Sequence, residues 1–142
     1  MIVMLKSCSL FSCRRGASAI EFAIVAPVFL LTLMTLIAFA IYLATAHAVQ
    51  QIAADSARIA VAGLSEMERT ELARTYIRSA SLDYPFIDPD ALDVTVRDAV
   101  EPGQFTVHLA YDAGDLPIWS LFTYALPDRQ IERFSTIRIG GL

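Results

Sequence analysis

The chain has 142 residues, of which 56% are hydrophobic, and it carries a formal net charge of −4 at pH 7. This length allows one domain at most, with an appendage. A mean hydropathy of +0.52 is high for a soluble domain, so we expect a strongly apolar segment to account for the excess.

Residues 1–16 are predicted to form a short basic leader. Both cysteines of the chain, Cys8 and Cys13, lie in it. We interpret them as reduced cytoplasmic thiols, because structural disulfides are rare in that compartment and no further metal ligands lie nearby. The short apolar stretch before Cys13 is interrupted by Lys6, which argues against a lipoprotein signal.

A long apolar segment follows the leader. Residues 22–54 contain no Asp, Glu, Lys or Arg, and their most apolar part covers residues 22–46. As a helix that part is about 37 Å long, enough to cross a hydrocarbon core of roughly 30 Å. The apolar core of a secretory signal is only about 7–15 residues long. The pattern therefore predicts one transmembrane helix.

The distribution of charge predicts the orientation of this span. The basic residues of the leader are Lys6, Arg14 and Arg15, and the first acidic residue is Glu21. Basic residues remain on the cytoplasmic side, so the N-terminus is predicted to be cytoplasmic and the chain after about His47 to lie outside. The outer part holds 14 acidic residues, 8 arginines and no lysine. This balance gives no support for binding nucleic acid or anionic lipid.

The helix is expected to continue well beyond the membrane, from Ala17 to about Ala62, with Pro27 as its only breaker. Gly63 is expected to end it, as glycine commonly does after a helix. The outer part carries a stripe suited to packing, formed by Val49, Ile52, Ser56, Ile59 and Gly63.

Small residues recur every four positions near the end of the span, at Ala40, Ala44 and Ala48. Such spacing allows two helices to approach closely in lipid, which makes these residues candidates for packing between subunits. The alternative is that alanine is present only because it favours helix formation.

A second helix is predicted to begin at Ser65, where Ser65 and Glu68 have the spacing of a capping box, and to end near Ser81. Its apolar face consists of Leu72, Ala73, Tyr76, Ile77 and Ala80. The next ten residues are predicted to form a loop, because they contain two prolines.

Four aspartates lie in or beside this loop, at Asp83, Asp88, Asp90 and Asp93. They could bind Ca²⁺ in an extracellular domain, but the segment lacks the glycine and the ligand spacing of a calcium loop. We therefore favour solvated acids in a connecting segment.

The last third of the chain is predicted to form strands. Residues 92–97 and 105–111 alternate apolar and polar side chains around the turn at 101–104, which predicts a hairpin. Residues 112–127 are expected to be irregular or briefly helical, with Trp119, Leu121 and Phe122 buried. A final strand over residues 131–139 completes a short antiparallel sheet packed on the long helix. The expected fold class is therefore α+β.

The sequence contains no nucleophile motif, phosphate loop or zinc spacing. His47 and His108 lack acidic partners at a suggestive spacing, so we interpret both as structural or exposed. These observations favour a protein that is not an enzyme and that uses no cofactor and no metal.

Glu21 is the residue that most needs an explanation, because a carboxylate at the edge of a membrane span is costly. One interpretation is a hydrated carboxylate among the headgroups. The other begins with cleavage after Gly16, which would give Ala17 a positively charged amine. The amine of a neighbouring subunit could then neutralise Glu21 within a polymer. We favour the second, because it accounts for Gly16, Glu21 and the span together.

Residues 15–22, Arg-Gly-Ala-Ser-Ala-Ile-Glu-Phe, resemble the processing site of type IV prepilins, and Phe22 after the glutamate is the variant of Flp/Tad-type pilins. Residues 23–31 and 51–58 resemble the TadE/TadG-like family of pilus-assembly proteins. Some members carry a second acid and a glycine late in the span, but residues 37–40 here contain neither. No role of that second acid is therefore carried over.

The resemblance implies a minor pilin-like protein of a Tad pilus system, cut by a prepilin peptidase between Gly16 and Ala17. Its expected partners are the inner membrane, the Tad assembly machinery and other pilin-like subunits. The pairing with those subunits is expected to involve Glu21 and Phe22. The expected division is a leader over 1–16, a long helix over 17–63 and a periplasmic α+β domain over 64–142. The alternative is a signal-anchored periplasmic binding module that does not polymerise.

Overall fold

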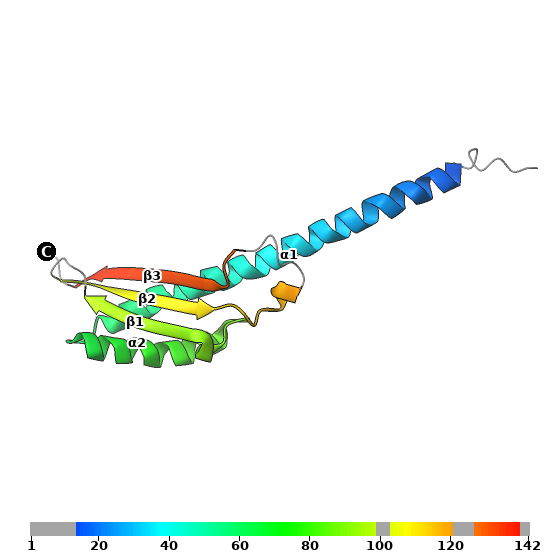
Figure 1. The fold of residues 1–142 in the computed structure, drawn as a ribbon. Coiled ribbons are helices and arrows are strands. Elements are labelled where there is room, and N and C mark those ends of the chain that lie inside the picture. The colour runs from blue at the N-terminus through cyan, green and yellow to red at the C-terminus, as the bar shows by residue number, and fades with distance from the viewer. Residues whose placement is uncertain (1–13, 99–102, 121–126, 140–142) are drawn as a thin grey trace, which may run out of the picture.

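The computed structural model describes residues 14–98, 103–120 and 127–139. The elements follow in the order α1 (Arg14–Ala60), α2 (Glu66–Ala80), η1 (Ser81–Asp83), η2 (Pro89–Ala91), β1 (Leu92–Asp98), β2 (Gln104–Asp112), η3 (Pro117–Ser120) and β3 (Gln130–Arg138). Two helices and a three-stranded antiparallel sheet confirm the α+β class, and the first half of α1 protrudes from the domain (Figure 1).

The helix α1 is a single element of 47 residues, which corresponds to about 70 Å. It runs through Pro27 without a break and begins three residues before the predicted start. The hydroxyl of Thr32 donates to the carbonyl of Val28 at 2.8 Å, and other threonines of α1 bond in the same way. These hydroxyls therefore need no partner outside the helix, which suits an apolar environment.

The turn from α1 into α2 is tight. Gly63 donates its N–H to the carbonyl of Ala60 at 3.0 Å, close to the predicted end of the helix. A Cβ atom at Gly63 would lie 2.8 Å from both the Cγ and the backbone nitrogen of Arg69. Glycine is needed here because the first turn of α2 comes close to the end of α1, and its role is not that of a left-handed helix terminator.

Arg69 joins three elements at this end of the domain. Its guanidinium bonds Asp98 at the end of β1 at 2.5 Å and, through Nε, the carbonyl of Gly63 at 3.1 Å. It also lies 5.0 Å from the centre of the Phe105 ring in β2. The planar guanidinium can therefore bond and stack at the same time, which the ammonium of lysine cannot do.

One of the two hydrogen bonds predicted for the capping box of α2 is present, and the other has a different partner. The Ser65 hydroxyl accepts the N–H of Glu68 at 3.2 Å. The Glu68 carboxylate, however, accepts the N–H of Leu64 at 2.9 Å and so reaches one residue further back than the predicted partner, Ser65. The helix ends at Ala80, as expected, and the Ser81 hydroxyl donates to the carbonyl of Ile77.

The sheet has the order β1-β2-β3, with both pairs antiparallel, which confirms the predicted hairpin and final strand. Val94 pairs with Leu109, and Leu109 pairs with Arg133. Gly103 adopts a positive φ of 78° just before β2, a conformation that glycine adopts without strain.

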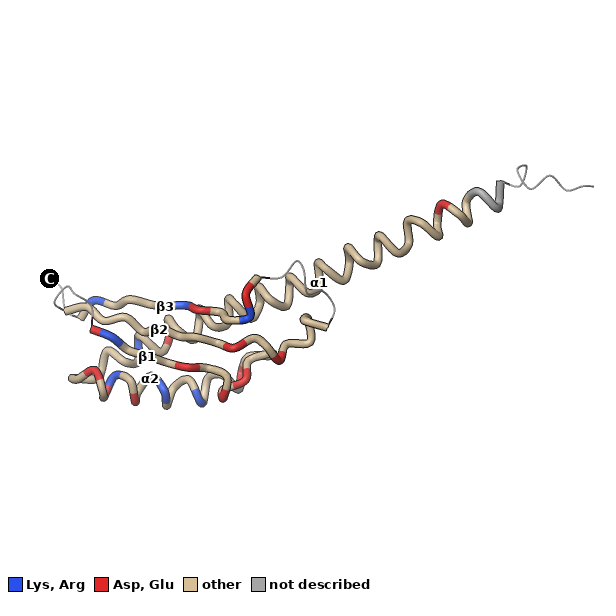
Figure 2. The backbone as a smooth tube through the Cα atoms, viewed as in Figure 1, with Lys and Arg blue, Asp and Glu red and all other residues tan. Residues whose placement is uncertain are grey.

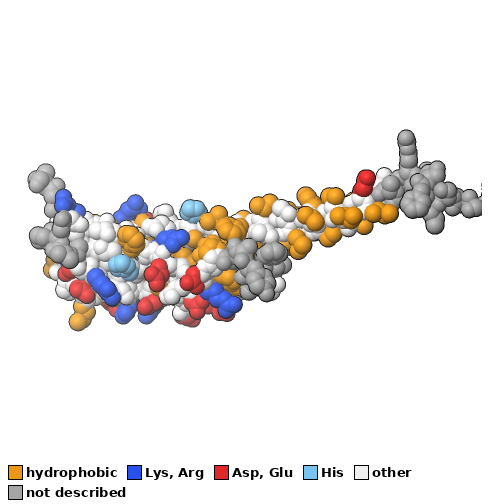
Figure 3. Space-filling model, turned by 45° about the horizontal axis from the view of Figure 1, so that its top comes forward, with side chains coloured by type: hydrophobic (Ala, Val, Ile, Leu, Met, Phe, Trp, Pro, Cys, Tyr) orange, Lys and Arg blue, Asp and Glu red, His pale blue; other side chains and the backbone are white. Residues whose placement is uncertain are grey.

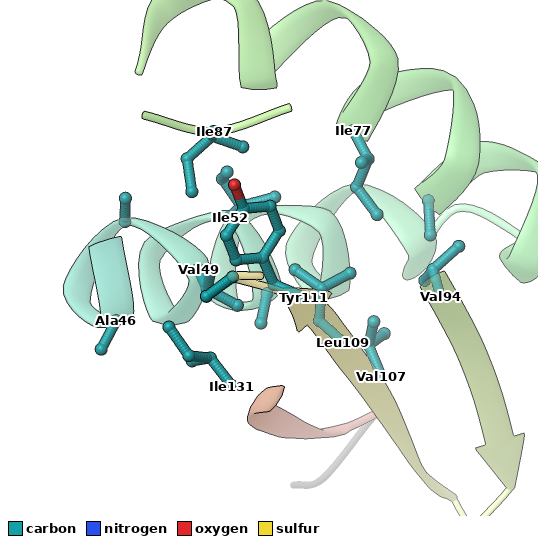
Figure 4. Close-up of a cluster of buried hydrophobic side chains, with 14 of the residues drawn as sticks. Ala46, Val49, Ile52, Ile77, Ile87, Val94, Val107, Leu109, Tyr111 and Ile131 are labelled. Atoms are coloured by element: carbon teal, nitrogen blue, oxygen red, sulfur yellow. The ribbon is translucent and has the colours of Figure 1, made fainter. Parts of the chain in front are cut away.

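The core lies between one face of the sheet and the two helices, and side chains from α1, α2 and all three strands meet there (Figure 4). Its largest fully buried side chains are Phe105, Ile52, Leu109, Ile118, Ile131, Val49, Val96 and Val107. The outer half of α1 is thus an integral part of the domain core.

The predicted stripe on α1 is largely confirmed, with one error. Val49, Ile52 and Ser56 are fully buried, but Ile59 is 40% exposed. Ala57 and Ala60 take its place against the domain. These small side chains allow α2 and the sheet to lie closer to the helix axis than an isoleucine would permit.

Residues 112–127 include the short turn η3, as the sequence suggested. Ile118 is fully buried, while Trp119 is only half-buried and donates from Nε1 to the carbonyl of Ala113. The guanidinium of Arg129 lies 5.2 Å from the centre of the Trp119 ring. The predicted burial of Leu121 and Phe122 falls outside the described residues.

Candidate assembly surface on the long helix

The protruding half of α1 is covered with exposed apolar side chains, whereas charged side chains gather on the domain (Figure 3). We call this surface the apolar sleeve; its large exposed side chains are Ile20, Phe22, Ile24, Val25, Val28, Phe29, Leu30, Leu31, Leu33, Leu36, Ile37, Phe39 and Leu43. An exposed apolar surface of this extent is unstable in water, so lipid or another protein must cover it.

The helix is long and apolar enough over Ser18–Ala60 to cross a membrane. The domain begins to cover one side of it at Ala38, which is fully buried, and at Tyr42, whose hydroxyl bonds the carbonyl of Asp128. On the other side, Phe39 and Leu43 remain exposed. The sleeve therefore continues past the point at which the domain begins.

Glu21 lies near the free end of this sleeve and is exposed. It is the only Asp, Glu, Lys or Arg between Ser18 and Ala54, and the tube between it and the domain is tan (Figure 2). Within the described part of the chain, no side chain pairs with it. Phe22 beside it is 72% exposed. The backbone of Gly16 and Ala17 is part of α1.

The three alanines at four-residue spacing do not share one environment. Ala48 is buried in the domain core, while Ala40 and Ala44 are exposed. Ala48 therefore serves the fold of this chain, and the other two remain available to a neighbour.

The two histidines are exposed. His108 lies on the outer face of the sheet, with its ring centre 5.9 Å from that of Phe134. In the loop before β1, a carboxylate oxygen of Asp88 accepts the N–H of Asp90 at 2.9 Å and so caps η2. Over the described ranges no group of three His, Cys, Asp or Glu side chains is arranged to hold a metal.

The structure adds a feature that sequence reasoning missed, a shallow apolar hollow of about 400 Å³ beside α1 where the helix leaves the domain. Its lining residues are Ala44, His47, Ala48, Gln51, Tyr84, Pro85 and Phe86. The only sequence signal was an aromatic residue after a proline in an acidic loop.

Phe86 has an unusual backbone at the rim of this hollow. Its φ is +68°, a left-handed conformation that bulky residues rarely adopt, and its side chain is 49% exposed. Its carbonyl accepts the hydroxyl of Tyr111 at 2.9 Å, while Ile87 next to it is buried. Burial raises the pKa of Tyr111 above its usual value, with a smaller contribution from the charge of Asp88.

These observations define a single-pass, membrane-anchored protein with an α+β domain. Residues 16–58 match the model of the family described as TadE-like protein, which confirms the resemblance seen in the sequence. The matched residues all lie in α1, so the likeness to this family covers the apolar helix and leaves the rest of the domain unmatched. The match ends two residues before the end of α1.

No curated protein and no solved structure matches the chain.

Proposed function

We propose that this protein is a minor pilin-like subunit of a Tad-type pilus assembly system, acting in pilus biogenesis and surface attachment. The observation that carries the proposal is the position of Glu21 near the free end of the apolar sleeve, within the TadE-like match, where no side chain of the described residues pairs with its carboxylate. A domain packed on the outer half of α1 is more than a bare fibre subunit needs, which favours a minor role.

The subunit waits in the inner membrane with residues 1–16 in the cytoplasm and the α+β domain in the periplasm. The basic leader supports this orientation, because cations stay on the cytoplasmic side. A prepilin peptidase then cuts between Gly16 and Ala17.

Cleavage creates the partner that Glu21 lacks. In a bundle of pilin-like helices the sleeve is covered by other apolar surfaces, and an unpaired carboxylate there is strongly unfavourable. The new amine of Ala17 on a neighbouring subunit can form a charge-assisted bond with Glu21. Phe22 lies beside this pair, and Ala40 and Ala44 permit close helix approach further along.

Substitutions at Glu21 separate processing from assembly. Glu21→Gln keeps the size of the side chain but removes its charge, so we expect normal cleavage and a loss of about tenfold or more in co-purification with other pilin-like subunits. Glu21→Asp retains the carboxylate and serves as the matched control. Mass spectrometry of the N-terminus and quantitative immunoblotting of the sheared pilus fraction provide the two readouts.

Normal assembly of Glu21→Gln would refute the pairing role. Absence of the wild-type chain from the sheared pilus fraction would instead favour the alternative, an anchored periplasmic binding module that does not polymerise.

A further inference from the structure

A second contact with the membrane follows from where the Tyr84–Phe86 loop lies. We propose that this loop, at the rim of the hollow beside α1, docks into the phospholipid headgroup layer on the domain side of the membrane. The inference requires only that α1 spans a membrane, and it does not depend on polymerisation.

The position of the loop along α1 can be compared with the thickness of a bilayer. Counted from Glu21, a hydrocarbon core of roughly 30 Å takes up about 20 residues of helix and ends near Ile41. Ala44, His47, Ala48 and Gln51 line the hollow, so its side on α1 extends from about 5 to about 15 Å beyond that edge. The headgroup layer is roughly 5–8 Å thick on each side, so the end of the hollow at Ala44 lies within it, and Pro85 and Phe86 line the same hollow.

The hollow also continues the surface that lipid already covers. Phe39 and Leu43 are the last exposed large apolar residues of the sleeve, and Ala44, one residue further, lines the hollow. Phe86 extends this apolar surface sideways from the helix. Lipid in contact with Leu43 can therefore reach Phe86 without crossing a polar boundary on α1.

The backbone keeps Phe86 directed outwards. Its left-handed conformation is held by the Tyr111 hydroxyl, which comes from the core side of β2. Ile87 fills the core in its place. An aromatic side chain held at the headgroup level is the usual form of an interfacial anchor.

The charge of the domain limits how deeply the loop enters the headgroup layer and which lipids it can contact. Red segments gather at the end of the domain from which α1 protrudes (Figure 2), and the aspartates Asp83, Asp88, Asp112, Asp115 and Asp128 are exposed. They keep the rest of this end in water and repel an anionic surface. Zwitterionic phosphatidylcholine and phosphatidylethanolamine are therefore the lipids that fit.

The contact can be tested in the wild-type protein by comparing the oxidation rates of two exposed phenylalanines. Phe86 is 49% exposed and Phe134, on the outer face of the sheet, is 64% exposed. In nanodiscs of phosphatidylcholine and phosphatidylethanolamine with one full-length copy each, we expect hydroxyl radicals to oxidise Phe86 about fivefold more slowly than Phe134. Rates in proportion to the two exposed fractions would overturn the proposal.

Depth is measured with a tryptophan at the loop. Trp119 is the only tryptophan of the chain, so Trp119→Phe provides a background for Phe86→Trp and for the control Leu64→Trp, which lies at the far end of the domain and is 92% exposed. Lipids brominated near the headgroup should quench Trp fluorescence in Phe86→Trp and leave it unchanged in Leu64→Trp.

Equal quenching at the two positions, or none at either, would overturn the proposal. One copy per disc ensures that a neighbouring subunit cannot produce the protection. A contact that forms only between subunits would leave Phe86 accessible in the discs, and this result would also count against lipid docking.

Discussion

Gly63 shows how a missing side chain allows the start of one helix to approach the end of another closely. A methyl group there would meet the backbone and the Cγ of Arg69 at 2.8 Å. We therefore predict that Gly63→Ala lowers the free energy of unfolding by about 1–3 kcal/mol, because α2 must shift away from α1. Urea denaturation of the detergent-solubilised protein measures this. Ala62→Ser, at an exposed neighbouring position, is the control and should change stability by less than about 0.5 kcal/mol.

Tyr111 makes stability depend on pH. Its pKa is raised in the fold, chiefly by burial, so the folded state disfavours the ionised form. The resulting stabilisation is fully present below the ordinary tyrosine pKa of about 10 and is lost as the pH rises through the higher folded value. Urea denaturation at pH 7 to 11 should show stability falling above about pH 10.

Tyr111→Phe should make this alkaline fall smaller and cost about 1 kcal/mol at pH 7, because the carbonyl of Phe86 loses its partner. A residual fall is expected, since burial also raises the pKa of Tyr76. An alkaline fall as steep in Tyr111→Phe as in the wild-type protein would contradict the assignment.

At the scale of elements, the first half of α1 is an exposed apolar helix and its outer half is part of the domain core. The buried face of the outer half could be predicted from the periodicity of the sequence. The spacing of Val49, Ile52 and Ser56 predicted the buried face correctly. The pattern failed at Ile59, because a stripe read by hydrophobicity cannot show that α2 lies close enough to favour alanine at positions 57 and 60.

This difference is testable with two equal truncations. Ile52→Ala should cost about 2–5 kcal/mol, since Ile52 is fully buried. Ile59→Ala should cost less than about 1 kcal/mol, because its side chain is partly exposed and adjoins solvent. The free energies of unfolding of the two variants, measured under the same conditions, provide the comparison. Equal losses would mean that the predicted stripe describes the packing better than the structure does.

The strands were predictable because apolar and polar residues alternate through 92–97 and 105–111, and burial in the structure follows this alternation. The hollow beside α1 could not be predicted from the sequence. It exists only where α1 meets the loop before η2, and its main residue, Phe86, depends on a hydrogen bond from Tyr111, 25 positions away. Such a contact leaves no local pattern in the sequence.

At the scale of the whole molecule, the apolar sleeve and the charged domain divide the chain between two solvents. A charge-free run of 33 residues made the sleeve predictable, since few other structures need one. The role of Glu21 was harder to predict, because its proposed partner lies on another chain.

The N-terminus of the protein in cells tests the proposed function most directly. The protein is extracted from membranes of a host with an active prepilin peptidase, and its N-terminal peptide is identified by mass spectrometry, in parallel with Gly16→Ala. We predict that the wild-type chain begins at Ala17 and that Gly16→Ala retains residues 1–16. A wild-type chain that keeps residues 1–16 beside a peptidase shown to cut another prepilin would contradict the pilin-like role.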